Sequence, residues 1–231
     1  YNAYSDFISS EGAPVFYARV DHVSVPLDKE GTGQVVVDFT PEPLTQDVSF
    51  AFHIEKTAGV VVDSLTAEIS GVPSTMELTT GLILAQKTYK LLFRPAYAAL
   101  PSAADSTSTE ALRCEAAVNI PGIVRSHTED MVTGPGILQI AIYTHYDYEE
   151  EGTQRKAAKV FHAGINLYHT LKECKSLQWD EEAGGYRQAS RSITVEIGTP
   201  LEIDKDGILN SGSTSTGLDQ WIPGETFEIE V

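Results

Sequence analysis

Apolar and polar side chains alternate one for one along several stretches of this 231-residue chain. In residues 48–54, for example, Val48, Phe50, Phe52 and Ile54 share one side of an extended backbone. Strict alternation indicates a strand with one buried face. The pattern recurs at 65–69, 193–197 and 227–231, and further strands are expected at 14–25, 34–40, 89–94, 111–119, 137–148 and 156–171.

Clusters rich in glycine, proline and acidic residues separate these stretches. Glycine supplies positive φ and proline fixes φ, so such clusters indicate turns. They lie at 28–33, 70–73, 134–136, 183–185 and 204–207. Gly164 is expected to bend or break the long strand at 156–171. Helical periodicity is nowhere sustained over three turns, so the sequence predicts an all-β sandwich or barrel.

The length of the chain suits one large β-domain or two domains of roughly a hundred residues each. Two soft stretches, 95–110 and 121–136, lack strand alternation and are candidates for a linker or a long loop. We expect a boundary within 95–135, and divide the chain into an N-terminal β-sandwich at 1–110 and a C-terminal one at 111–231. The strand at 111–119 is assignable to either side.

The chain is strongly acidic, with 16 Lys and Arg against 33 Asp and Glu and a formal net charge of −17. Nucleic acids and anionic membrane surfaces bind proteins through Lys and Arg, so this charge argues against both as partners. A hydrophobic content of 42% argues against disorder. No run of about 18 apolar residues is present to span a bilayer. The start at Tyr1, without Met, suggests an exported chain whose leader has been removed.

The two cysteines, Cys114 and Cys174, are far apart in the sequence and form no CxxC pair. A zinc site needs more closely spaced ligands, and a disulfide scaffold needs more cysteines. Either one structural disulfide or two buried thiols fits the sequence.

The sequence contains none of the common catalytic motifs: no G-x-S-x-G, H-E-x-x-H, G-x-x-x-x-G-K-[ST] or strand-linked G-x-G-x-x-G. We therefore predict a non-enzymatic protein with no catalytic residues and no cofactor. His145, His162 and His169 lie on one expected hairpin, but His162 and His169 point to opposite faces of a regular strand. Residues 202–210 imitate the start of a calcium loop but read better as an acidic turn. No metal site is predicted.

Aromatic residues offer a second functional interpretation. Tyr143, Tyr146 and Tyr148 follow one another along an expected strand, and Trp179 and Trp221 lie in loop-like sequence. Exposed aromatic rings with polar rims are suited to sugars. A glycan-binding surface lipoprotein of the outer membrane is therefore the alternative function, with these five residues as possible contacts.

The segment SLTAEISGVPSTMELTTG, from Ser64 to Gly81, resembles a segment of fimbrillins and fimbrillin-like surface lipoproteins of Gram-negative anaerobes. The layout of two β-rich halves and the ending at 221–231 are similar too. The resemblance implies two tandem transthyretin-like β-sandwich domains and export as a lipoprotein. It also implies a structural or adhesive role as a type V pilus-like subunit or accessory subunit, at the outer membrane or in the fimbrium.

In that family a trypsin-like protease removes the first strand, and a strand from another subunit fills the groove. The resemblance places the cut at Lys29, in the loop 27–31, with Arg19 as the alternative. Arg19 lies inside the expected strand 14–25 and would be protected if that strand is paired. The implied partners are other fimbrial subunits, joined by strand addition, and surface glycans or proteins of host or bacteria. A membrane would be reached through a lipid anchor outside this chain.

Overall fold

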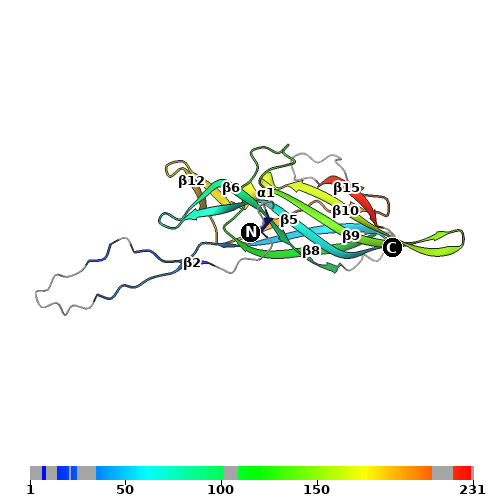
Figure 1. Cartoon of the computed structure of the whole chain (residues 1–231), viewed down its shortest axis with the longest axis horizontal. Coiled ribbons are helices and arrows are strands. Elements are labelled where there is room, and N and C mark those ends of the chain that lie inside the picture. The colour runs from blue at the N-terminus through cyan, green and yellow to red at the C-terminus, as the bar shows by residue number, and fades with distance from the viewer. Residues whose placement is uncertain are drawn as a thin grey trace, which may run out of the picture.

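The regular secondary structure of the described residues is almost entirely β-strand, as the sequence predicts. The computed structural model describes residues 7–8, 15–20, 22–24, 35–100, 109–209 and 221–229. In these residues one short helix, α1 (Tyr168–Glu173), accompanies the strands (Figure 1). No helix in the described part is long and apolar enough to cross a membrane.

The strands form two large sheets and one small one. The larger sheet has the order β11 (Leu177–Asp180), β12 (Gly185–Gln188), β6 (Leu82–Phe93), β5 (Val60–Glu77), β9 (Ile137–Glu150), β10 (Thr153–Asn166) and β15 (Trp221–Ile229), with β1 (Phe7–Ile8) also on β6. The smaller sheet has the order β13 (Ser192–Glu196), β4 (Gln46–Thr57), β8 (Thr109–Ile120) and β7 (Ala96–Ala99), with β14 (Leu201–Ile203) also on β4. The strands β2 (Phe16–Tyr17) and β3 (Glu42–Pro43) pair separately.

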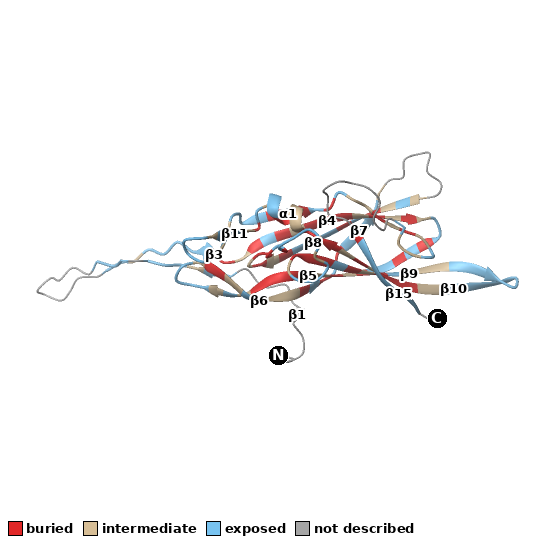
Figure 2. Cartoon of the chain, turned by 90° about the horizontal axis from the view of Figure 1, so that it is seen from above, coloured by how far each residue is buried: buried red, intermediate tan, exposed pale blue. Residues whose placement is uncertain are grey.

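The two large sheets pack face to face as a sandwich. The alternating apolar residues of β4 point into the core, and Phe50 stacks on Phe93 of the larger sheet with ring centroids 5.1 Å apart. Phe52 meets Trp221 of β15 edge-on at 5.9 Å. Figure 2 shows the buried residues between the two layers. Aromatic contacts of this kind add to the burial that holds the layers together.

The two halves of the chain are interleaved. β4 pairs with β8 along its whole length, and β5 pairs with β9, so strands from 1–110 and 111–231 share both sheets. One core cluster spans these strands. The expected division into tandem sandwiches at residue 110 is therefore wrong for the described strands. Alternation reveals which face of a strand is buried but not which strand lies beside it.

Several expected strand boundaries also change. In 15–20, 22–24 and 35–40, β2 is the sole strand, so the long strand at 14–25 and the strand at 34–40 do not form within the described residues. The expected turn at 70–73 lies inside β5, where the register against β6 shifts and Gly71 adopts φ +91°. Glycine at a positive φ is typical of a bulge.

The strand expected at 156–171 ends at Asn166. Gly164 does not break it, because β10 stays paired there with Gln139 of β9 and Ile222 of β15. Asn166 ends it instead: its Oδ1 accepts a hydrogen bond of 3.0 Å from the backbone N–H of Tyr168, where α1 begins. A side chain that competes for backbone hydrogen bonds favours such a change of element.

The edge of the smaller sheet is made of two strands placed end to end. β13 and β14 both run parallel to β4, and Ile197 N–H continues the ladder between them by donating to Ala51 O at 2.9 Å. Cys114, on β8, and Cys174, just after α1, are both free thiols, so the disulfide alternative is not realised.

Candidate functional site

An arm, defined here as residues 15–20, 22–24 and 35–43, projects from one end of the sandwich (Figure 1). At its base Leu44 N–H donates to Val15 O at 2.7 Å, and Tyr17 of β2 faces Glu42 of β3. Beyond this short ladder, the described residues of the arm are not part of any strand. The arm therefore carries backbone groups that a further strand can pair.

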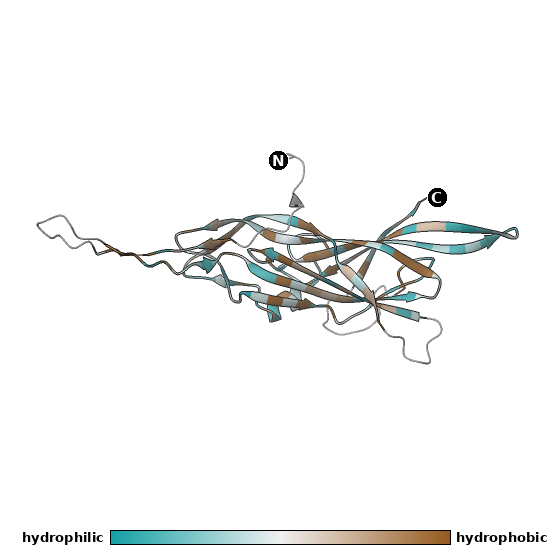
Figure 3. Cartoon of the chain, turned by 90° about the horizontal axis from the view of Figure 1, so that it is seen from below, coloured by the Kyte–Doolittle hydropathy of each residue, from teal (hydrophilic) through white to brown (hydrophobic). Residues whose placement is uncertain are grey.

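The described arm is unusually apolar for an exposed segment. Val36 is 77% exposed and Phe39 is 58% exposed. The other large exposed apolar side chains of the arm are Val15, Phe16, Val20, Val23 and Val35. Figure 3 shows the hydrophobic colour continuing along the arm outside the sandwich. Contiguous exposed apolar surface of this kind is typical of an interaction site.

The two candidate cleavage residues lie in or near this arm. Arg19 is exposed and lies outside β2, so the paired strand that would have protected Arg19 does not form at this residue. Lys29 lies outside the described residues. The sequence interpretation preferred Lys29, and of the two only Arg19 has a described environment.

The N-terminal strand β1 sits on the outer edge of β6. Phe7 pairs with Lys90 and Ile8 with Leu91 in a parallel ladder, and β12 reaches the same edge at Ile83. Because β1 is only two residues long, it makes few hydrogen bonds there. Removing it would open the edge of β6 to another strand.

β15 forms the opposite edge of the larger sheet. Trp221, its first residue, is only 2% exposed and donates from Nε1 to Thr199 O at 2.9 Å. Together with its contact to Phe52, this makes Trp221 a core residue. The expectation that Trp221 contacts a glycan is therefore wrong, and the sequence missed this because a Pro-Gly pair follows the tryptophan inside the strand.

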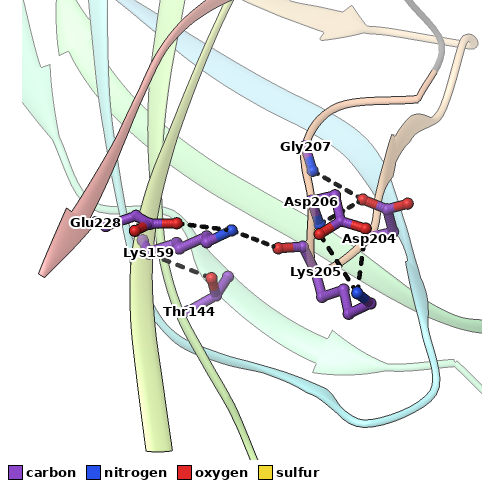
Figure 4. Close-up of polar contacts among 7 residues, drawn as sticks. All are labelled: Thr144, Lys159, Asp204, Lys205, Asp206, Gly207 and Glu228. Atoms are coloured by element: carbon purple, nitrogen blue, oxygen red, sulfur yellow. Dashed lines mark hydrogen bonds and ion pairs between the residues drawn. The ribbon is translucent and has the colours of Figure 1, made fainter. Parts of the chain in front are cut away.

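A buried lysine fastens β15 to the rest of the fold (Figure 4). Lys159 Nζ lies 3.2 Å from Glu228 Oε1 of β15 and donates to Lys205 O at 2.9 Å. Burial lowers the pKa of Lys159, but the hydrogen bond to Glu228 and the nearby charges of Tyr146 and Glu228 outweigh it, so the pKa is raised. Lys159 thus stays charged at neutral pH.

Lys159 reaches the acidic turn around Lys205, whose sequence imitates the start of a calcium loop. Asp204 Oδ1 accepts hydrogen bonds of 2.7 Å from the N–H groups of Asp206 and Gly207. This is the geometry of an acidic turn in which the carboxylate shapes the backbone. The interpretation as an acidic turn is confirmed for Asp204 to Gly207, which make these hydrogen bonds (Figure 4).

The candidate tyrosines of β9 and the candidate histidines do not gather at one site, and His169 lies on α1, outside the expected hairpin. Tyr146 and Tyr148 share a face with ring centroids 6.2 Å apart and a tilt of 51°, whereas Tyr143 falls on the other face. His145 lies 2.8 Å from Asp63 and His169 lies 2.9 Å from Glu129, so these two imidazoles have separate partners. The described residues contain no group of three or more metal-binding side chains.

Trp179 is the candidate aromatic residue that is most open to solvent. It is 55% exposed on β11 and packs edge-on against Tyr186, its partner across the β11–β12 hairpin, at 5.0 Å. Arg187 Nε donates to Asp180 Oδ2 at 2.7 Å, and this hydrogen bond lowers the pKa of Asp180. Arg187 also donates to Thr80 O at 3.0 Å, which ties the hairpin to the turn before β6.

Trp179 and Tyr186 line a pocket of about 490 Å³, which we call the Trp179 pocket. Its remaining walls come from the loop after β8, from α1 and from the residues that follow α1: Arg125, Ser126, His127, Leu171, Lys172, Lys175, Leu177 and Gln178. Sequence reasoning found Trp179 but missed the basic residues. The spacing of Lys172 and Lys175, three residues apart, was the available signal.

Asn166 holds the loop wall of the Trp179 pocket. Its Nδ2 donates to Thr128 O, Glu129 O and Met131 O at 2.9–3.0 Å, and its Oδ1 accepts from Ser126 Oγ at 2.8 Å. The same side chain begins the turn into α1, so one asparagine positions both the loop and the helix. The loop wall of the Trp179 pocket and the start of α1 are thus held by hydrogen bonds to the same side chain.

Comparisons with protein-family models, with curated proteins and with solved structures found no match to this chain. The resemblance to fimbrillins carried by Ser64–Gly81 stays a prediction. In the structure that segment is β5 from Ser64 to Glu77, followed by the turn to Gly81.

Proposed function

We propose that this protein is a non-enzymatic structural or adhesion subunit of the cell surface, a fimbrial subunit or accessory subunit that assembles by β-strand exchange. The observation that carries the proposal is the arm, with extended backbone and exposed Val36 and Phe39. A strand added to another subunit gains a ladder of hydrogen bonds and buries alternate side chains in its core.

The edges of the two large sheets offer sites where such a strand can add. Among the residues that the structure describes, the two residues of β1 are the strand that pairs with the edge of β6 at Lys90 and Leu91. Cleavage at Arg19 or Lys29 would release β1 together with β2, and would expose this edge. Under this proposal the subunit acts at the outer membrane, held by a lipid anchor outside this chain, and its partners are further subunits.

The test compares oligomerisation before and after limited trypsin digestion. Size-exclusion chromatography with light scattering is run over a range of concentrations on the wild type and on the arm variants Val36→Asp and Phe39→Asp. The control is Val61→Asp, because Val61 is 45% exposed at the start of β5, where it pairs with His145 of β9, and it lies outside the arm.

We expect the wild type and Val61→Asp to form oligomers, either before or after digestion. Both arm variants should remain monomeric, with circular dichroism spectra like that of the wild type. A wild type that stays monomeric at all concentrations, before and after digestion, would overturn assembly by strand exchange. Equal oligomerisation of all variants would overturn the role of the arm.

Glycan binding remains the alternative proposal. Of its five candidate residues, Trp179 supports it best, because this ring is exposed and lines a pocket. Binding of sugars to the protein, lost in Trp179→Ala and kept in Tyr148→Ala, would support the alternative. A glycan array on which wild type and Trp179→Ala are equally silent would overturn it.

A further inference from the structure

The Trp179 pocket has a charge opposite to that of the whole protein. Its lining includes Arg125, His127, Lys172 and Lys175 and no aspartate or glutamate. The chain as a whole has 33 acidic residues against 16 Lys and Arg, so a random selection of lining residues would be acidic. Three of those 16 basic residues meet at one pocket.

The two lysines of the Trp179 pocket differ from other basic residues in their partners among the described residues. In the described part of the chain, Lys56, Lys90 and Arg113 each form an ion pair with a glutamate. By contrast, the side chains of Lys172 and Lys175 form no hydrogen bond or ion pair with any described residue. A cationic site left without internal anions attracts an external one.

Arg125 is positioned in a different way from the two lysines. Its guanidinium lies over the ring of Tyr168, 5.3 Å from the centroid. Stacking on an aromatic face holds the planar group in place and leaves its N–H groups able to donate to a carboxylate. The loop that carries it is fixed through Asn166, so the cation is held in place before a ligand arrives.

Lys175 is held in a conformation that lysine disfavours. Its φ is +52°, and among the described residues only Glu151 shares a positive φ without being glycine. Lys175 follows directly after the C-cap Cys174, at the position where helices commonly end in glycine. Keeping a side chain there costs stability relative to glycine. Such strain is found at functional sites, where the side chain is needed.

The aromatic wall adds a second requirement for the ligand. Trp179 offers an exposed indole beside Tyr186, and Gln178 adds an amide. Indole faces pack against the apolar C–H face of a sugar ring, while amides and cations meet its polar groups. A volume of about 490 Å³ accommodates one or two sugar rings.

We propose that the Trp179 pocket binds a carboxylate-bearing sugar, with the ring on Trp179 and the carboxylate facing Arg125, Lys172 and Lys175. The proposal rests on the glycan-binding alternative and names its ligand class. It is independent of strand exchange, because the pocket includes no residue of the arm, of β1 or of β15.

The test is calorimetric titration of the full chain with trigalacturonate and with the galactose trisaccharide of the same linkage, which lacks only the carboxylates. We expect trigalacturonate to bind, the neutral trisaccharide to bind at least about tenfold more weakly, and added salt to weaken the acidic ligand selectively. Trp179→Ala should weaken trigalacturonate binding about tenfold. Lys156 is an exposed lysine on the β9–β10 hairpin. Lys156→Ala is the control for the variant Lys175→Gly described below, because each substitution removes one positive charge.

Lys175→Gly separates a binding role from a structural one. If Lys175 serves the ligand, replacing it by glycine raises Tm by roughly 2–4 °C, because the strain is relieved, and still lowers trigalacturonate affinity about tenfold. A lysine kept only to stabilise the C-terminus of α1 would instead lower Tm on replacement and leave affinity unchanged.

Three results would overturn the proposal. The first is no binding of trigalacturonate. The second is equal binding of the neutral trisaccharide, which would keep a glycan site and remove its charge preference. The third is that inorganic phosphate binds as tightly as trigalacturonate. This result would show that the pocket selects its ligand by negative charge alone. Failure of oligomerisation would bear on strand exchange and not on this pocket.

Discussion

Lys159 Nζ donates a hydrogen bond of 2.9 Å to the main-chain carbonyl of Lys205, and so joins the larger sheet to the turn after β14 of the smaller sheet. The same ammonium group lies 3.2 Å from Glu228 of β15. One buried cation therefore links the two layers and the edge strand at the same end of the sandwich.

Replacing Lys159 should give a pH-dependent loss of stability. We expect Lys159→Met to lower the unfolding free energy at pH 7 by about 1 kcal/mol, because a charged donor to two acceptors is lost. The folded-state pKa of Lys159 is raised. Its contribution is therefore complete below the unfolded pKa of about 10.4 and is lost as pH rises through the folded value.

Urea denaturation of wild type and Lys159→Met between pH 7 and pH 11.5 measures this difference. The gap between the two proteins should narrow above pH 10.4. Glu228→Gln is the matched partner variant, and should cost under about 1 kcal/mol because Glu228 is 78% exposed. A gap that is constant through the alkaline range would show that the charge of Lys159 contributes nothing.

The two tryptophans should respond oppositely to a fluorescence quencher. Trp179→Phe leaves Trp221, which is buried against Phe52, so its emission should be blue-shifted and poorly quenched by acrylamide. Trp221→Phe leaves the exposed Trp179, whose emission should be red-shifted and strongly quenched. Circular dichroism checks that each variant is folded, and equal quenching in the two variants would contradict the placement of the rings.

Gly71 and Gly59 offer a matched pair for the bulge in β5. Both have φ +91°, but a Cβ on Gly71 would lie 2.5 Å from Val124 O, whereas a Cβ on Gly59 meets nothing within 4 Å. Gly59→Ala should cost about 1–2 kcal/mol from backbone strain alone. Gly71→Ala should cost more than about 4 kcal/mol. Similar denaturation midpoints for the two variants would argue against the close approach of the loop at Val124.

Thiol titration tests the environment of the cysteines. Burial raises the pKa of Cys114 to about 12 and also raises the pKa of Cys174. At pH 8 on the order of one in ten thousand Cys114 side chains is then a thiolate, so the native protein should react slowly with a disulfide reagent. The denatured protein should react at both thiols. The absence of any free thiol after denaturation would indicate a disulfide between Cys114 and Cys174.

The sequence predicts the faces of the strands well and their partners poorly. Val48, Phe50, Phe52 and Ile54 are buried as their alternation indicates, because burial of one face is a local property of a strand. That β4 lies between β8 and the β13–β14 edge depends on pairing across the whole chain. No local pattern specifies such partners, and a soft stretch inside one sandwich therefore resembles a linker.

The candidate site divides in the same way. Trp179 and Trp221 look alike in the sequence, and only the core contact of Trp221 with Phe52 separates them. Arg125 and Lys175 are far apart along the chain and meet because Asn166 fixes a loop beside α1. The sequence of the arm predicts strands at 14–25 and 34–40, since a local pattern does not show whether a partner strand is present.

The parallel pairing of Ser192–Glu196 with Asp47–Ala51 joins residues about 145 positions apart, and so limits how fast the protein can fold. Closing so long a loop lowers the conformational entropy of the chain before any stabilising contact forms. During synthesis β4 is made early and its neighbours β13 and β14 are made late. A newly made chain therefore stays without its complete smaller sheet for longer than one built from neighbouring hairpins.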